Sequence, residues 1–175
     1  MGDPGVQNVR SMVEIVFVCT GNTCRSPMAE GLLRDRIPAA WRPLVRVSSA
    51  GVYAWEGQPA SAMAVSAMSA VGIDISGHRA RVLTPSIIHG SSLLVAMAAE
   101  HRERINRIAP GAGEWTILIG ELDPARNDPD IEDPIGGDAE TYSAVRNDIE
   151  GLIGPLLRYM SENLDLSPGG EREGG

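Results

Sequence analysis

The sequence predicts an α/β fold of three layers, in which a four-stranded parallel sheet carries helices on both faces. Two observations lead to this fold class. Short apolar runs rich in β-branched residues alternate with segments whose apolar residues have helical spacing, as expected for parallel strands joined by helices. The chain also has 175 residues, 43% of them hydrophobic, which is enough to bury one such core.

The two ends of the chain differ from the rest in composition. The segments 1–11 and 165–175 are rich in Gly, Pro and charged residues and show no hydrophobic period. We therefore expect disordered tails over 1–11 and 165–175, and a single folded domain over 12–164.

The first strand and the first helix carry the clearest signals. The run VEIVFV over 13–18 is short and β-branched and ends at a loop with Gly and Asn, which predicts a buried strand. A helix should follow from Ser26-Pro27, because Pro suits the first helical turn. One face of that helix is apolar, formed by Met28, Ala29, Leu32 and Leu33.

The alternation of strand and helix then continues. We expect strands over 44–48, 92–97 and 115–119, and helices over 59–71, 101–108 and from 139 onwards. In the helix over 59–71, Ala64, Met68 and Val71 share a face. In the last helix, Gly154-Pro155 should kink or end the regular part.

Charge and cysteine usage limit the partners. The formal net charge is −8, which disfavours binding to nucleic acid or to an anionic membrane surface. The only cysteines, Cys19 and Cys24, are too close together to form the stabilising disulfide framework of a secreted protein. No stretch approaches the roughly 20 continuous apolar residues that cross a bilayer. We expect a cytoplasmic protein without a cofactor, and its oligomeric state is open.

The loop after the first strand lies where an α/β fold binds its ligand. It reads Cys19-Thr20-Gly21-Asn22-Thr23-Cys24-Arg25-Ser26-Pro27. Gly21 and Asn22 tolerate positive φ, so successive N–H groups can turn inward and form a phosphate-binding loop just before a helix N-terminus. The Gly-Lys-Ser/Thr ending of a nucleotide-binding Walker loop is missing.

Cys19 stands at the mouth of this loop and is the expected nucleophile. The helix dipole, the inward N–H groups and Arg25 all favour its thiolate, so we expect deprotonation at neutral pH. Arg25 can offer two parallel donors to phosphoryl oxygens, and attack by Cys19 would give a cysteinyl-phosphate. The alternative for Cys19 is a small buried hydrophobic residue at a strand end. The spacing of Cys19, Cys24 and the histidines does not match usual zinc sites, so no metal is expected.

The loop resembles the signature of the low-molecular-weight protein tyrosine phosphatases, in which Cys, five residues, Arg and then Ser or Thr open a small α/β domain. The likeness runs from 13 to about 159, because three further blocks fall in family order: Ser49-Ala50-Gly51, Gly77-His78-Arg79-Ala80 and Asp133-Pro134.

The resemblance implies a role for each matching residue. Asp133 would be the general acid that protonates the leaving group, with Asp128 and Asp130 as nearby competitors and a plain Asp-Pro turn as the alternative. Ser49 and His78 would support the loop, and Ser26 would steady the thiolate. The expected substrate-binding residues are Thr20, Gly21, Asn22, Thr23, Cys24, Ser26, Trp55 and Ile135.

Two departures bear on the substrate. Eukaryotic members carry a branched apolar residue at the position of Thr23 and an aromatic pair after the Asp-Pro, where this chain has Ile135-Gly136. Trp55 and Tyr53 are then the aromatic residues left to flank a phosphotyrosine ring. Thr23 and the Asp-Pro-Ile-Gly-Gly run instead resemble the bacterial protein arginine phosphatases, although those usually have Phe in place of Ile135. The substrate is expected to be a phosphoprotein that carries phosphoarginine or phosphotyrosine, with phosphoarginine favoured.

Two other functions compete with hydrolysis. An arsenate-reductase-type oxidoreductase shares this fold and loop but needs further cysteines, and none follows Cys24. A non-catalytic phosphate-binding module would not require Cys19, Arg25 and Asp133 together.

Overall fold

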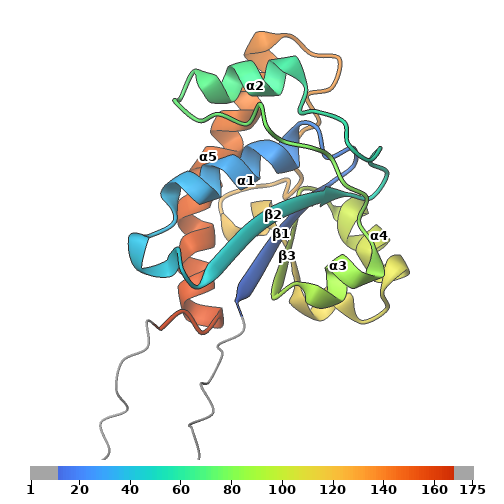
Figure 1. Ribbon diagram of the computed structural model, residues 1–175, viewed down its shortest axis with the longest axis vertical. Coiled ribbons are helices and arrows are strands. Elements are labelled where there is room, and N and C mark those ends of the chain that lie inside the picture. Colours follow the sequence, from blue (N-terminus) through green and yellow to red (C-terminus); the bar gives the residue numbers. More distant parts are fainter. Residues whose placement is uncertain (1–11, 168–175) are drawn as a thin grey trace, which may run out of the picture.

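A parallel sheet with the strand order β2-β1-β3-β4 forms the middle layer of the protein (Figure 1). The computed structural model describes residues 12–167. The strands are β1 (Val13–Cys19), β2 (Val45–Gly51), β3 (Leu93–Ala96) and β4 (Thr116–Leu118). Because all pairings are parallel, the strands end at one edge of the sheet, where Cys19 pairs with Gly51.

Helices cover both faces of this sheet, as predicted. Figure 1 shows α1 and α5 on one side of the strands and α3 and α4 on the other. The α-helices are α1 (Arg25–Arg36), α2 (Ala62–Ser69), α3 (Pro85–Gly90), α4 (Ala99–Ile108) and α5 (Ala139–Asn163). Short 3-10 helices are η1 (Ala39–Trp41), η2 (Ala112–Trp115) and η3 (Ile119–Leu122).

The central strand β1 divides its side chains between two hydrophobic cores. Ile15 and Phe17 belong to the core that includes the buried faces of α1, α2 and α5. Val16 and Val18 belong to the core under α3 and α4. This alternation follows from the period of two along a strand, and it explains why a strand covered on both faces is apolar throughout.

Some predicted boundaries are wrong. The helix predicted over 59–71 is α2, which begins only after the Ser61 side chain caps it, and Val71 is 39% exposed instead of packed. The regular part of α5 does not end at Pro155, since the helix continues to Asn163. α3 was not predicted, although Thr84 caps it and Pro85 occupies its first turn.

The C-terminal end of the domain reaches further than the sequence indicated. Leu166, which was assigned to the C-terminal tail, is 5% exposed and packs in the core with α1 and α5. The tails expected over 1–11 and beyond 167 lie outside the described residues. Among residues 12–167, no helix combines the length and apolar character needed to cross a membrane.

Candidate active site

The loop between β1 and α1 is pressed against the end of β2. The Val52 N–H donates to the Cys19 carbonyl at 3.0 Å, and the Tyr53 N–H donates to the Thr20 carbonyl at 2.9 Å. Gly51 makes this approach possible, because a Cβ on it would lie 2.5 Å from the Thr20 carbonyl oxygen and 2.9 Å from the Asn22 nitrogen. The sequence singled out the block around Gly51 but did not reveal this contact.

The backbone of the loop changes direction at Asn22. It is fully buried, and it is the non-glycine residue with positive φ (56°) in the described chain. Of the two residues expected to tolerate positive φ, Asn22 adopts it and Gly21 does not. Since non-glycine residues in this region are strained, the surroundings must hold Asn22 in place.

Every polar group of the Asn22 side chain has a partner. Its amide nitrogen donates to the Ser26 and Ser49 hydroxyls, each at 2.9 Å. Its amide oxygen accepts from the Arg81 backbone N–H at 2.9 Å. The His78 Nε2 donates to the Asn22 carbonyl at 2.7 Å. The predicted neighbours Ser49 and His78 therefore contact the loop, and Arg81 is a further contact that sequence reasoning missed.

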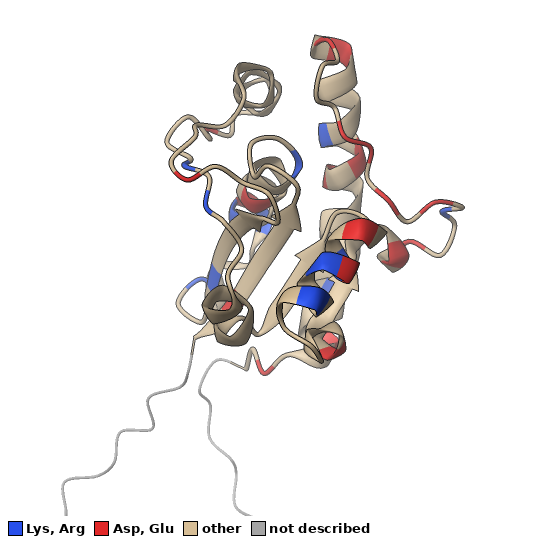
Figure 2. Cartoon of the chain, turned by 90° about the vertical axis from the view of Figure 1, so that its right-hand side faces the viewer, with Lys and Arg blue, Asp and Glu red and all other residues tan. Residues whose placement is uncertain are grey.

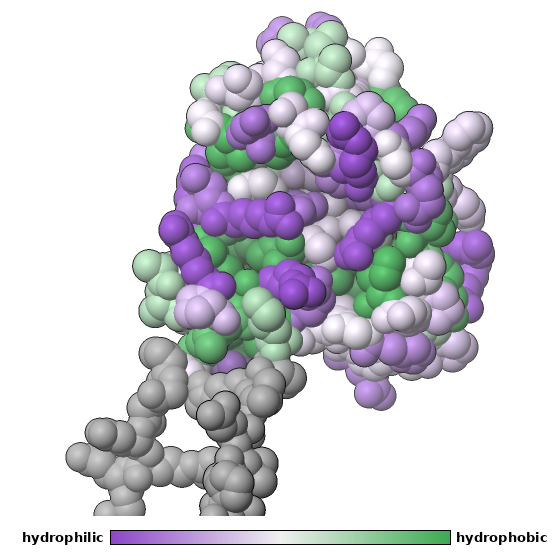
Figure 3. Space-filling model, in the orientation of Figure 1, coloured by the Kyte–Doolittle hydropathy of each residue, from purple (hydrophilic) through white to green (hydrophobic). Residues whose placement is uncertain are grey.

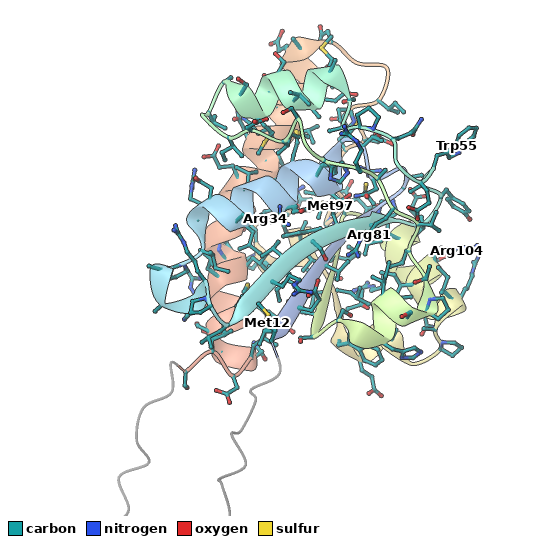
Figure 4. All side chains as sticks on the ribbon, viewed as in Figure 1. Met12, Arg34, Trp55, Arg81, Met97 and Arg104 are labelled. Carbon is teal, nitrogen blue, oxygen red and sulfur yellow. The ribbon has the colours of Figure 1, made fainter. Side chains whose placement is uncertain are left out.

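A groove lies behind these contacts, between α1, β2 and the segment 72–81. The hydrophilic band across the face in Figure 3 includes this region, and Figure 4 shows the long side chains of Arg34 and Arg81 there. Ser49 and His78 form part of its wall. Glu30, also in the wall, accepts from Ser49, so a chain of hydrogen bonds leads from this groove to Asn22.

Cys19 lies at the base of the loop with its sulfur close to donors. Its Sγ is 2.9 Å from the Ser26 hydroxyl and accepts from the Asn22 N–H at 3.3 Å. Burial raises the pKa of the Cys19 thiol, and the contacts with Ser26, Arg25 and Asn22, which lower it, do not outweigh burial. Desolvation of the sulfur therefore opposes the thiolate form that we expect for Cys19 at neutral pH.

The N-terminus of α1 is suited to an anion. Its N-cap residue, Cys24, makes no side-chain capping hydrogen bond, and the first turn holds no acidic residue. By contrast, Ser61, Thr84 and Asp138 cap α2, α3 and α5 with their side chains. The N-cap side chain therefore accepts from none of the first N–H groups of α1, at the positive end of the helix dipole, and the Ser26 N–H is directed at the Cys19 sulfur.

The structure brings Arg25 and Asp133 together across 108 positions of sequence. The Arg25 Nη2 lies 3.3 Å from an Asp133 oxygen, and its Nη1 donates to the Ile131 carbonyl at 3.0 Å. Arg25 is 4% exposed, whereas Asp133 is 42% exposed. The Ile131 N–H in turn donates to the Met97 carbonyl at 2.8 Å, which ties the Asp133 loop to the end of β3.

The two acidic competitors of Asp133 have other partners. Asp130 accepts from the Ala99 N–H at 2.8 Å, at the start of α4. Asp128 accepts from the Asp130 N–H at 2.9 Å. Arg126 pairs with Asp148 on α5 and also donates to the Asp128 and Asp130 carbonyls, so this part of the loop is anchored. Of the three carboxylates, Asp133 is the one paired with Arg25.

The surroundings of the loop are aromatic on one side and acidic on another. Tyr53 is 61% exposed, and the Arg104 guanidinium lies over its ring at 5.1 Å. Trp55 is 75% exposed and projects from the same edge as Arg104 (Figure 4). Ile135 is 71% exposed on the Asp133 loop. Figure 2 shows the acidic residues spread along the segment that leads into α5.

Thr23 and Cys24 turn toward α2 and α5. The Cys24 Sγ lies 3.3 Å from the Tyr142 hydroxyl and 3.4 Å from the Ser61 hydroxyl. The Thr23 carbonyl accepts from the Ser61 N–H at 2.9 Å. Cys24 is buried, and both it and Cys19 are free thiols.

His101 is a buried residue that sequence reasoning did not connect with the loop. It is fully buried, and its Nε2 lies 2.9 Å from the Thr20 hydroxyl. Burial lowers the pKa of His101 to about 4, the positive charge of Arg25 adds to this, and Asp133 opposes it. The imidazole is therefore neutral near pH 7.

This pKa predicts a pH dependence of stability. Between pH 6.5 and about 4 the unfolded chain protonates this imidazole and the folded protein does not, so acidification favours unfolding. We expect the free energy of unfolding to fall over this range and to fall less steeply in His101→Gln. Urea denaturation at several pH values measures both slopes. Equal slopes would mean that His101 titrates alike in both states.

Known proteins with a similar sequence and fold indicate the family of this chain. The family model of low molecular weight phosphotyrosine protein phosphatase covers residues 14–166. The chain belongs to this family. A protein-arginine-phosphatase from Geobacillus stearothermophilus is 40% identical over 146 residues, which are 83% of this chain and 95% of the relative. The low molecular weight protein-tyrosine-phosphatase Etp from Escherichia coli K12 is 37% identical over 148 residues, 85% of this chain and 90% of the relative.

Solved structures of the family have the same fold. The YwlE arginine phosphatase from Geobacillus stearothermophilus superimposes with a TM-score of 0.77 at 38% identity, over 86% of this chain and 94% of that one. A YwlE mutant with a phosphorylated active-site serine gives 0.78 at 30% identity, over 89% and 100%. Members of this phosphatase family thus include proteins named for arginine and for tyrosine dephosphorylation.

Proposed function

We propose that this family member hydrolyses phosphorylated proteins through a cysteinyl-phosphate on Cys19. The observation that carries the proposal is the meeting of Cys19, Arg25 and Asp133 around a loop with inward donors at the start of α1. Cys19 loses its proton to solvent and attacks phosphorus. Arg25 binds phosphoryl oxygens while the bond to the leaving group breaks, and Asp133 donates the proton that the leaving group takes.

The second step regenerates the enzyme. Asp133, now a carboxylate, takes a proton from water, whose oxygen attacks phosphorus as the S–P bond breaks. Phosphate leaves and Cys19 is restored. The relative with a phosphorylated serine in its active site supports a covalent intermediate of this kind.

The test of this function is hydrolysis by the wild type against Cys19→Ser. We expect the wild type to hydrolyse para-nitrophenyl phosphate and the variant to be inactive while folded. A variant as active as the wild type would exclude the cysteinyl-phosphate. Arsenate reduction without phosphatase activity would favour the arsenate-reductase alternative, and phosphate binding without turnover would favour a binding module.

For the substrate residue we favour phosphoarginine over phosphotyrosine. Thr23 and Ile135 stand where bulkier apolar or aromatic residues would line a phosphotyrosine pocket. Relatives named protein-arginine-phosphatase, at 40% and 33% identity, support this choice. Because other relatives are named protein-tyrosine-phosphatase, phosphotyrosine is also tested as a substrate.

Thr23 provides a direct test of substrate choice. Its methyl and hydroxyl help shape the cup around the leaving group, and Ile would present a larger apolar surface. We expect Thr23→Ile to shift the ratio of kcat/KM toward phosphotyrosine, by about tenfold for the 1–3 kcal/mol that such pocket changes are worth. The measurement compares phosphotyrosine and phosphoarginine peptides of one sequence. Thr23→Ser, which keeps the hydroxyl, is the control, and an unchanged ratio in Thr23→Ile contradicts the assignment.

We also propose that Cys24 protects Cys19 from over-oxidation. Peroxide would convert Cys19 to a sulfenic acid, and Cys24 could condense with it to a disulfide if their Cβ atoms approach to about 4 Å. Its present contacts with Tyr142 and Ser61 are weak hydrogen bonds, which such a rearrangement must break.

The redox test compares the wild type with Cys24→Ser. After brief peroxide exposure, we expect dithiothreitol to restore the activity of the wild type but not that of the variant. Equal recovery would mean that Cys24 serves only to pack the loop. The expected cytoplasmic location suits such free thiols and rests on cysteine usage.

A further inference from the structure

His101 is a buried polar side chain that the proposed mechanism does not use. It lies in the first turn of α4, beneath the loop that follows β1, and it is fully buried. Its Nε2 is 2.9 Å from the Thr20 hydroxyl and 3.5 Å from a Glu100 oxygen. Within residues 12–167, its Nδ1 has no hydrogen-bond partner. One ring nitrogen of this buried histidine is hydrogen-bonded to the loop and the other has no partner. Buried polar groups are rarely unpaired, so the arrangement needs a physical explanation.

Thr20 connects this imidazole to the phosphate-binding arginine. The Thr20 oxygen accepts a hydrogen bond from the Arg25 Nη2 at 3.3 Å, on the side chain that also contacts His101. Arg25 has two other described contacts, with the Ile131 carbonyl and with Asp133. Asp133 is 42% exposed, whereas Ile131 is buried and Thr20 is half-buried, so Thr20 and Ile131 are the contacts of Arg25 that are better shielded from solvent.

The unpaired Nδ1 indicates the tautomer of His101. A neutral imidazole carries its proton on one nitrogen, and buried N–H groups without an acceptor are rarer than buried acceptors without a donor. The proton therefore belongs on Nε2, which donates to Thr20. The Thr20 oxygen then accepts from His101 and Arg25 with its two lone pairs, and this arrangement fixes the Thr20 rotamer.

We propose that His101 is a positioning residue for Arg25: it holds the Thr20 hydroxyl, and Thr20 holds the guanidinium in the orientation that receives the phosphoryl group. The inference rests on the proposed function of Arg25. The charged groups that face the imidazole are Arg25 from α1, Asp133 from the loop before α5, and Glu100 from α4. A neutral imidazole orients Arg25 without placing a second positive charge beside it.

The test separates this link from simple core packing. His101→Phe keeps a ring and loses both nitrogens, Thr20→Val removes only the hydroxyl, and His101→Gln can place an amide N–H where Nε2 lies. We expect His101→Phe and Thr20→Val each to lower kcat/KM by about tenfold, as expected for one hydrogen bond to a charged network. His101→Gln should recover to within about threefold of the wild type. His89→Phe, an exposed histidine on α3, is the control and should leave kcat/KM unchanged.

The double variant gives the decisive comparison. If both residues act through one link, His101→Phe with Thr20→Val loses about tenfold in total, whereas independent packing effects would multiply to about 100-fold and overturn the proposal. No gain from Gln over Phe would also overturn it. Should His101→Phe fail to fold, Thr20→Val alone decides, since wild-type kcat/KM in that variant would exclude the link.

Calorimetry of inorganic phosphate binding tests the positioning of Arg25 without requiring turnover. We expect the Kd for phosphate to rise about tenfold in His101→Phe and in Thr20→Val. If the wild type hydrolyses no phosphate ester yet these shifts appear, the proposed function fails and the positioning of Arg25 stands. If the wild type is active and the phosphate Kd is unchanged in both variants, the positioning proposal is wrong.

Discussion

Asp133→Asn is expected to lower kcat/KM by about 100- to 10,000-fold on phenyl phosphate, a substrate with a poor leaving group. The constant kcat/KM reports the steps up to departure of the leaving group, whereas kcat also includes hydrolysis of the cysteinyl-phosphate, which is the same for every substrate. The loss should be much smaller on para-nitrophenyl phosphate, because para-nitrophenolate leaves without needing a proton. The reason is positional: Asp133 is the carboxylate paired with Arg25, and its 42% exposure lets it reach a leaving group that points outward. Steady-state kinetics on a series of aryl phosphates measures the effect as a slope against leaving-group pKa.

Asp130→Asn is the matched control for this experiment. Asp130 accepts from the Ala99 N–H at the start of α4, so its substitution should disturb packing and change kcat/KM by a similar factor on every substrate. The assignment of Asp133 as general acid would be wrong if Asp133→Asn lost the same factor on good and poor leaving groups. A leaving-group dependence in Asp130→Asn would instead move the role to that residue.

Gly51→Ala is expected to reduce kcat/KM by about 100-fold and to destabilise the fold by about 1–3 kcal/mol. The added Cβ would lie 2.5 Å from the Thr20 carbonyl oxygen, 2.8 Å from the Ala54 Cβ and 2.9 Å from the Asn22 nitrogen. Two of these atoms belong to the loop backbone, which cannot move aside without displacing the N–H donors proposed to bind phosphate. Kinetics and thermal unfolding of the purified variant measure the two effects.

Gly90→Ala is the control for the glycine substitution. A Cβ on Gly90 would meet no atom within 4 Å, and the residue does not have positive φ, so the variant should match the wild type in both measurements. Wild-type kinetics in Gly51→Ala would mean that the loop tolerates displacement by the end of β2. It would also remove the close approach of Gly51 as an explanation for the loop's shape.

Much of the fold could be read from local patterns along the chain. The β-branched run that became β1 and the apolar face of α1 depend on neighbours in sequence, and both were predicted. The predicted ends of helices were wrong where contacts with residues far away in sequence decide how far the helix continues. α5 runs through Pro155 because its apolar residues before and after the proline, such as Leu152, Leu156 and Met160, pack in one core.

The sequence by itself determined the loop that we propose to bind phosphate, since Cys19, Arg25 and the start of the helix lie within one short segment. The resemblance had already favoured Asp133, but tertiary structure decided which remote groups contact this loop and how. Asp133 rather than Asp130 meets Arg25, Gly51 and Arg81 shape the backbone at Asn22, and His101 reaches Thr20. These contacts join the ends of parallel strands, and residues far apart in sequence become neighbours there only when the strands align at one edge of the sheet.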